Sequence, residues 1–286
     1  MTILPANFPI RLGWGGVLTT LVLLAGCATP GDPPPPLLQA AAGQTRVGEE
    51  AYLTGHAGEA VPALNEAARL HFAAGDLPGA ARALLNLALA QRAAGDSVSA
   101  AATAVRMHDL TPAARQQARE QGGKEEFSAE LAAASVWLDA LLALDRGDSA
   151  TAASLLASAT EKLSGSSPWP GRLETLRAEI ALGEGRFQEA LGHARAGQAD
   201  SAATKDRAEE ARARQFAGTA HLRLGQWLEA RADFLAAIKI EESLGGGARM
   251  TNDLNQLAAI AEHLGDSAAA QLYTERARAI AAARAR

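Results

Sequence analysis

The hydrophobic positions beyond residue 39 recur with the 3.6-residue spacing of amphipathic helices. The pattern is clearest between residues 211 and 244, where two one-sided stripes follow each other. The first stripe is Ala213, Phe216, Ala217, Ala220 and Leu224, and the second is Trp227, Ala230, Phe234, Ala237 and Ile238. We expect a hairpin of two helices whose stripes face each other.

A glycine followed five residues later by an alanine marks the turns of such hairpins. The pair occurs at Gly55/Ala60, Gly75/Ala80, Gly95/Ala100, Gly147/Ala152, Gly185/Ala190, Gly225/Ala230 and Gly265/Ala270. Glycine ends a helix at the lowest conformational cost, and the small alanine lets the next helix press against the previous one. Four of these glycines precede a potential helix cap, namely Asp76, Asp96, Asp148 and Asp266. The last three pairs are 40 residues apart, which indicates a solenoid of stacked hairpins.

The composition favours helices throughout, because Ala, Leu, Glu and Arg dominate and β-branched and aromatic residues are few. We therefore predict an all-α fold. Residues 115–132, with the break Gln121–Lys124, are expected to connect a first block of repeats (41–114) to a second (133–284). A further connection, Ser164–Gly171, carries Trp169. This side chain either serves function, as loop residues often do, or folds back to cap the apolar edge of a neighbouring repeat.

Residues 211–244 resemble a tetratricopeptide repeat (TPR), a helical hairpin of about 34 residues. The residues that carry the resemblance are Gly218, Gly225, Ala230, Phe234 and Ala237. The segment departs from the family pattern at Arg214, His221 and Glu242, where Trp, Tyr and Pro are usual. The looser matches elsewhere in 41–114 and 133–284 imply a TPR-like solenoid of five or six repeats.

In the TPR family the first helix of each repeat lines a groove, and the resemblance implies a partner-binding surface. Carrying the family positions over gives Trp137, Arg172, Arg212, Gln215, Arg223, Asn252, Asn255 and His263, with Tyr52, Arg82, Arg92, Leu141, Glu179, Leu222 and Glu262 as further members. Such a mixture of charged, amide and aromatic side chains suits an extended peptide or a partner helix. The alternative for each of these side chains is plain solvation.

The N-terminus has the architecture of a secretory signal peptide. A single charge, Arg11, precedes an apolar run that is too short and too glycine-rich for a membrane span of about 20 residues. Leu24-Ala25-Gly26-Cys27 resembles the lipobox of bacterial lipoproteins, which implies removal of residues 1–26 and acylation of Cys27 by fatty acids such as palmitate. The proline-rich residues 27–40 are expected to form an extended tether.

The lipoprotein resemblance also implies a location. Ala28 follows the cysteine, where lipoproteins retained in the inner membrane often carry Asp, so the expected location is the periplasmic face of the outer membrane. An uncleaved N-terminal anchor is the alternative. Cys27 is the single cysteine, so no disulfide within the chain is expected once its thiol is acylated.

The net charge and the absence of known catalytic motifs argue against several classes of function. The chain without residues 1–26 has 26 Lys and Arg against 32 Asp and Glu, and no basic run, which argues against a nucleic-acid partner. The six histidines lack the spacing of a zinc site, and we expect no metal or cofactor. No phosphate loop, dinucleotide fingerprint or nucleophile elbow is present, so neither an enzyme nor a small-molecule substrate is expected.

The hypothesis that follows is a membrane-anchored protein–protein interaction scaffold of the bacterial envelope. Its layout is similar to that of TPR lipoproteins in outer-membrane β-barrel assembly and of the pilotins of type IV pili, which implies a role in an outer-membrane, pilus or secretion complex. The alternative is an adaptor that regulates a peptidoglycan-modifying enzyme. An enzyme whose site is assembled from distant residues is a third possibility.

Overall fold

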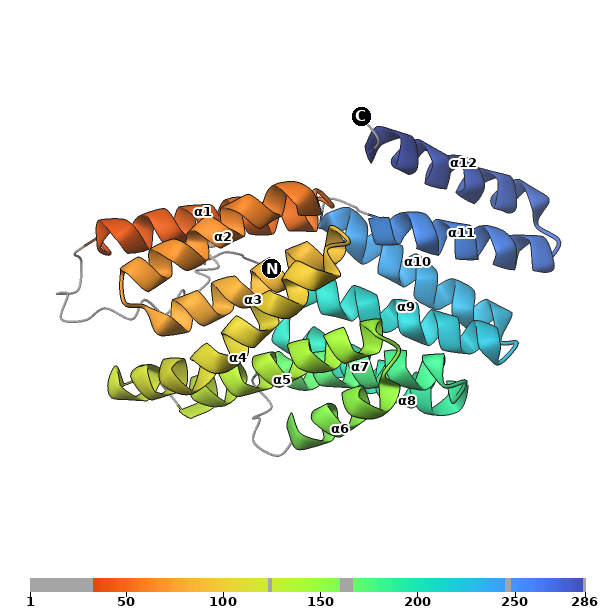
Figure 1. The fold of residues 1–286 in the computed structure, drawn as a ribbon. Helices are drawn as coiled ribbons and strands as arrows, with labels where there is room; N and C mark the ends of the chain where they lie inside the picture. Colours follow the sequence, from red (N-terminus) through yellow and green to blue (C-terminus); the bar gives the residue numbers. More distant parts are fainter. Residues whose placement is uncertain (1–32, 123–124, 160–166, 245–247, 285–286) are drawn as a thin grey trace, which may run out of the picture. The chain divides into compact units, whose positions relative to one another are not determined.

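The described part of the chain consists of paired α-helices. The computed structural model describes residues 33–122, 125–159, 167–244 and 248–284. Every regular element in these ranges is an α-helix, and consecutive helices lie side by side as antiparallel pairs (Figure 1). The helices are α1 (Pro36–Leu53), α2 (Ala57–Ala73), α3 (Leu77–Ala93), α4 (Ser97–Glu120), α5 (Glu125–Asp145), α6 (Ser149–Ala159), α7 (Trp169–Gly183), α8 (Phe187–Thr204), α9 (Arg207–Arg223), α10 (Trp227–Ser243), α11 (Ala248–His263) and α12 (Ser267–Arg284).

The predicted turns are confirmed. All seven glycines of the glycine–alanine pattern adopt a positive φ, between 72° and 87°, where an L side chain is strained. All four predicted aspartates cap the helix that follows: each accepts a hydrogen bond from the backbone N–H three residues on, at 2.9–3.0 Å. The alanines of the pattern are buried, as close helix contact requires.

The hairpin α9–α10 is built as the hydrophobic pattern predicted. The alanines of the first stripe are buried, whereas Phe216 and Leu224 are half-buried. On α10, Phe234 is 1% exposed and its ring lies against Gly218 of α9. A Cβ at position 218 would stand 3.0 Å from that ring, so the small residue is required by contact with its partner helix.

Two predicted segment boundaries differ from the helices observed. The first helix begins at Pro36, inside the segment expected to be an extended tether, because proline fits the first turn of a helix, where its missing N–H is not needed. Most of residues 115–132 is also helical. They belong to the end of α4 and the start of α5, and Gly122 takes the positive φ that ends α4. The described residues from Pro35 onward form one compact unit.

The helix α5 is both long and apolar. Its residues Phe127–Asp145 are long and apolar enough to cross a membrane, but most of them are buried by neighbouring helices, as in the core helix of a water-exposed repeat protein. Leu138 and Leu141 are 1% exposed and pack in a core with residues of α3 and α7. Packing against other helices therefore accounts for the apolar character of α5.

The signal-peptide and lipidation predictions lie outside the described residues. Arg11, the lipobox residues Leu24–Cys27 and Ala28 all precede residue 33. They remain predictions from the sequence.

Candidate interaction surface

Three of the predicted groove residues hold the array together. Arg172 of α7 donates to the Oδ2 of Asp206, the N-cap of α9, at 2.8 Å. Arg212 of α9 donates to the Oε2 of Glu179 on α7 at 2.6 Å, and its guanidinium lies over the ring of Phe216. These charge-assisted bonds join the first helices of consecutive repeats. The two arginines are engaged within the chain.

Gln215 is the third engaged residue. Its Nε2 donates to Glu241 Oε1 on α10 at 3.0 Å and to Asp253 Oδ2 on α11 at 2.8 Å. The amide therefore joins three helices at one point. Arg92 of α3, one of the further candidates, is engaged in the same way by Asp145 at the end of α5. The pattern of engaged residues thus extends to earlier repeats.

Trp137 does not belong to an exposed groove. It is 3% exposed, and its ring meets the ring of Trp169 edge-on with centroids 5.8 Å apart. The assignment of Trp137 as a surface residue is corrected: the pairing of α5 with α7 covers it. Trp169 itself is 7% exposed and starts α7, with the Arg172 guanidinium 5.1 Å from its ring centroid. The indole thus packs onto a neighbouring repeat, as the cap alternative predicted.

The predicted groove residues Arg223, Asn252, Asn255 and His263 are exposed. Of the further candidates, Leu141 is buried, and Tyr52 and Leu222 are half-buried. Arg223 ends α9, and Asn252 and Asn255 lie one turn apart near the start of α11. Within the described residues, no ion pair and no side-chain hydrogen bond joins these three to another residue. His263 is exposed, and its ring stacks on half-buried Trp227 with a centroid distance of 3.7 Å. Arg223, Asn252, Asn255 and His263, which we call the open face, keep their polar groups available for a partner.

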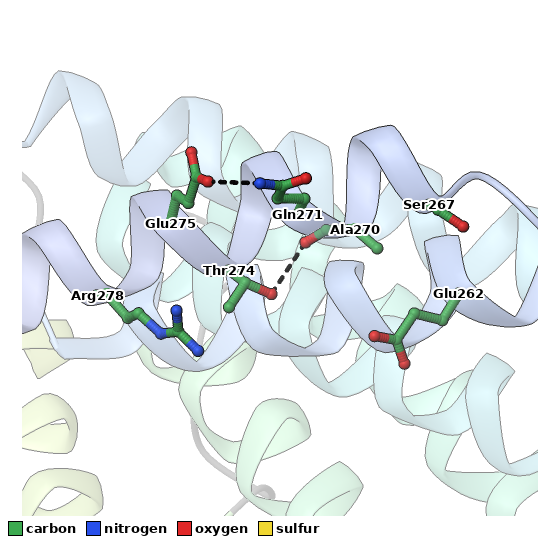
Figure 2. Close-up of a pocket in the computed structure, with 7 residues that line it drawn as sticks. All are labelled: Glu262, Ser267, Ala270, Gln271, Thr274, Glu275 and Arg278. Atoms are coloured by element: carbon green, nitrogen blue, oxygen red, sulfur yellow. Dashed lines mark hydrogen bonds between the residues drawn. The ribbon is translucent and has the colours of Figure 1, made fainter.

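A hollow of about 330 Å³ lies on α11 and α12 (Figure 2). Six of the seven residues that line it have polar side chains, namely Glu262, Ser267, Gln271, Thr274, Glu275 and Arg278, and the seventh is Ala270. Forty residues earlier, the equivalent positions in α9–α10 include Leu222, Trp227, Phe234 and Ile238, which pack against Met250, Leu254 and Leu257 of α11. The hollow is therefore the place where a following helix would pack, but with polar side chains in place of apolar ones. Polar side chains disfavour a further apolar helix there.

One set of residues has the composition of a catalytic triad without its geometry. Ser135 of α5 lies 3.5 Å and Asp139 3.3 Å from His108 of α4, and both distances end at the same ring nitrogen, Nδ1. A serine triad needs the serine and the acid on opposite ring nitrogens. These three residues therefore do not form an activated nucleophile. Among the described residues there is also no cluster of three or more histidines, cysteines and carboxylates that could hold a metal ion.

A buried acidic cluster, which the sequence pattern did not predict, lies between α9, α10 and α11. Asp253 is 1% exposed and Glu241 is 6% exposed, and both contact Gln215. Burial raises the pKa of Asp253 to about 7, and the neighbouring Glu241 raises it as well. Burial likewise raises the pKa of Glu241. The signal available in the sequence was the 40-residue register, which places Asp253 where the preceding repeat has the buried Ala213.

The chain was compared with protein-family models, curated proteins and solved structures, and the solved structures show which fold it has. No protein-family model matches the sequence, and no curated protein is a significant match to it. Among solved structures, BtubC (BKLC) from P. vanneervenii is 20% identical and aligns over 87% of this chain and 92% of its own, with a TM-score of 0.56.

Two further structures align with lower scores. The APC/C heterotetramer Cut9–Hcn1 is 14% identical over 85% of this chain and 50% of its own, with a TM-score of 0.47. The TPR2AB domain of yeast Sti1 in its complex with pHSP90 is 17% identical over 85% and 91%, with a TM-score of 0.34. The helix pairs described above and the alignment with BtubC together show the fold: the described chain is an all-α, TPR-like solenoid.

Proposed function

We propose that this protein is an interaction scaffold that binds a segment of a partner protein on the open face. The observation that carries the proposal is the division among the predicted groove residues. Arg172, Arg212 and Gln215 bond within the chain. Arg223, Asn252 and Asn255 are exposed, and no ion pair or side-chain hydrogen bond joins them to another of the described residues. A folded array that leaves one group of donors and acceptors open offers them to another molecule.

The chemistry of the open face suits an extended peptide or the polar side of a helix. Each asparagine has an amide that donates and accepts, which matches the pairing needs of a peptide backbone. The guanidinium of Arg223 offers two parallel donors to a carboxylate. The stacked rings of Trp227 and His263 add an apolar surface at the C-terminal end of α11.

We further propose that the scaffold is tied to the outer membrane through acylated Cys27 and faces the periplasm. Support comes from the sequence, namely the lipobox-like Leu24–Cys27, the preceding apolar run and Ala28. An anchor confines the scaffold to the membrane surface and raises the effective concentration of a partner in the same place. The proposed role is therefore assembly of an envelope complex such as a pilus, secretion or outer-membrane protein machine.

Crosslinking in living cells tests the scaffold. A photoreactive amino acid at position 223 or 255 is expected to give a discrete adduct whose second component is an envelope protein. The matched control places the same group at position 69, an exposed arginine on α2. If the adducts at 223 and 255 equal those at 69, the open face is not the binding surface. An adduct with a cell-wall hydrolase or synthase would favour the adaptor alternative.

A pair of arginine substitutions separates binding from folding. Arg223→Ala is expected to reduce adduct formation from position 255 and to leave the unfolding midpoint unchanged, because Arg223 is exposed and has no ion pair or side-chain hydrogen bond with another described residue. Arg212→Ala is expected to lower the midpoint, because it removes the bond to Glu179 and the contact with Phe216. Equal effects of both substitutions on stability would contradict the proposed distinction between residues that bond within the chain and residues of the open face.

The anchor has its own test. Wild-type cells grown with a labelled fatty acid are expected to yield labelled protein in the outer-membrane fraction, and Cys27→Ser is expected to abolish both label and membrane association. Labelled protein in the inner membrane would overturn the sorting proposal alone. Unlabelled protein would overturn the anchor.

A further inference from the structure

The contact of α9, α10 and α11 contains two carboxylates where a repeat array normally packs apolar groups. Glu241 and Asp253 are buried, and one amide nitrogen, Gln215 Nε2, donates to an oxygen of each. Their other oxygens, Glu241 Oε2 and Asp253 Oδ1, are fully buried and have no hydrogen-bond partner. A buried acceptor without a donor is costly, and more so when it is charged.

We propose that Asp253 and Glu241 form a proton-operated clasp, which holds α11 on α9 and α10 when the pair carries a proton and loosens that contact when both carboxylates are ionised. A proton on one of the two orphan oxygens removes a buried charge and converts an acceptor into a donor. The clasp sits at the junction between two repeats, so its state acts on the docking of the α11–α12 hairpin.

The charged side chains around Asp253 and Glu241 do not fully neutralise the two carboxylates. The cation nearest to them is Arg249 of α11, whose Nε is 3.6 Å from Glu241 Oε1, and half of this side chain faces solvent. From α9 the facing group is the uncharged Gln215. The titratable groups of α12 face elsewhere, as with Arg276, which pairs with Glu242 on the exposed side of α10. The two buried carboxylates therefore have a single half-exposed arginine, Arg249, as their nearest cation.

The raised pKa of Asp253, about 7, lies far above the ordinary 3.8, so the pair takes up a proton in the range where exposed carboxylates have already lost theirs. Protons bind the closed state more tightly than the open state, and closing is therefore favoured by acid. The opening equilibrium is expected to rise about tenfold per pH unit between pH 5 and 6.5 and to level off above pH 7.

The inference extends the proposed function and is tested separately from it. Asn252 and Asn255 of the open face are on the same helix as Asp253, so loosening of α11 at high pH would lower the affinity for a partner there. This consequence rests on the proposed function. The clasp itself is a property of the protein alone, and its test needs no partner.

The test combines two measurements on the full-length protein in detergent. The ¹³C carboxyl resonance of Asp253, identified by its loss in Asp253→Asn, is expected to titrate near pH 7. Hydrogen exchange, corrected for the intrinsic effect of pH, is expected to show opening of α11 and α12 that increases from pH 5 to pH 7. The amides of α1 and α2 are expected to lack this increase.

Two variants and one control complete the design. Asp253→Asn keeps the shape of the side chain without its ionisation. Asp253→Ala copies the buried residue of the preceding repeat at position 213. Both are expected to remove the pH-dependent opening, whereas Glu262→Gln, on the exposed side of α11, is expected to keep it. A titration of Asp253 near pH 4, or wild-type pH dependence in both Asp253 variants, would overturn the clasp.

Discussion

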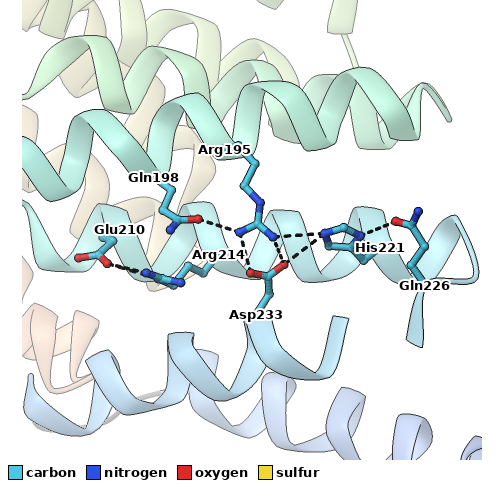
Figure 3. Close-up of polar contacts among 7 residues, drawn as sticks. All are labelled: Arg195, Gln198, Glu210, Arg214, His221, Gln226 and Asp233. Carbon is cyan, nitrogen blue, oxygen red and sulfur yellow. Dashed lines mark hydrogen bonds and ion pairs between the residues drawn. The ribbon is translucent and has the colours of Figure 1, made fainter. Parts of the chain in front are cut away.

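The guanidinium of Arg195 on α8 holds the carboxylate of Asp233 on α10 with two parallel hydrogen bonds of 2.8 Å (Figure 3). Arginine only donates, so the His221 Nε2 atom that lies 3.2 Å from Arg195 Nη2 must accept. The proton of His221 is therefore assigned to Nδ1, which donates to Gln226 Oε1. The network joins α8, α9 and α10, so one ion pair links two successive repeats.

The first prediction concerns this pair. Arg195→Met is expected to destabilise the protein by about 1–3 kcal/mol, because it leaves the carboxylate of Asp233, which is 4% exposed, without its two hydrogen-bond donors. Part of the loss should return in Arg195→Met/Asp233→Asn, which removes the charge as well. Thermal unfolding followed by circular dichroism measures both. The control Arg186→Met, at an exposed pair, is expected to leave the midpoint unchanged. No recovery in the double variant would contradict the explanation.

The second prediction concerns the core of α9–α10. Phe234→Ala should cost about 3–5 kcal/mol, because it removes a buried ring and leaves a cavity beside Gly218. Leu235→Ala, at the next and 40% exposed position, is the matched control and should cost far less. Denaturant unfolding compares the two. Similar costs would show that burial in this hairpin does not decide stability.

The third prediction concerns pH and the cap of α3. Burial raises the pKa of Asp76, but hydrogen bonds from His71 and the Gly79 N–H outweigh burial and lower it below 3.8. A lowered pKa contributes stability that is present above the ordinary value and is lost as pH falls through the folded value. Asp76→Ala is therefore expected to cost about 1 kcal/mol at pH 7 and less near pH 3. Unfolding midpoints of both proteins at the two pH values test this, and an equal cost at both would contradict it.

The fourth prediction concerns the polar hollow on α11 and α12. The triple variant Glu262→Leu/Thr274→Phe/Arg278→Ile gives the hollow the residues of the preceding repeat. It is expected to self-associate, because the variant exposes an apolar face that a helix normally covers. Light scattering after size exclusion measures the mass. Glu262→Gln/Thr274→Ser/Arg278→Lys, which keeps the face polar, should elute as the wild type does. A triple apolar variant with the wild-type mass would refute the interpretation.

Local features of the sequence were enough to predict the helices and their turns. A glycine with positive φ, an aspartate that bonds to the N–H three residues on, and an apolar stripe each act within one or two turns of chain. Gly225 and Asp266 illustrate this, since neither needs a distant partner to do its work. Pro36 shows the limit of the same reasoning: a proline-rich run suggested an extended chain, yet its last proline starts a helix.

The tertiary structure decided whether each polar side chain is paired within the protein or exposed. By sequence alone, Arg212 and Arg223 are two arginines on one helix, and Asp253 is one more acid. The difference arises because Glu179 lies within 2.6 Å of Arg212, and Glu241 and Gln215 close around Asp253. These partners are 12 to 38 residues away in sequence, and their distances depend on how neighbouring hairpins pack. The sequence by itself determined the helices, because backbone preferences act locally along the chain. The tertiary packing determined which polar side chains remain exposed, because burial and pairing depend on residues that are distant in sequence.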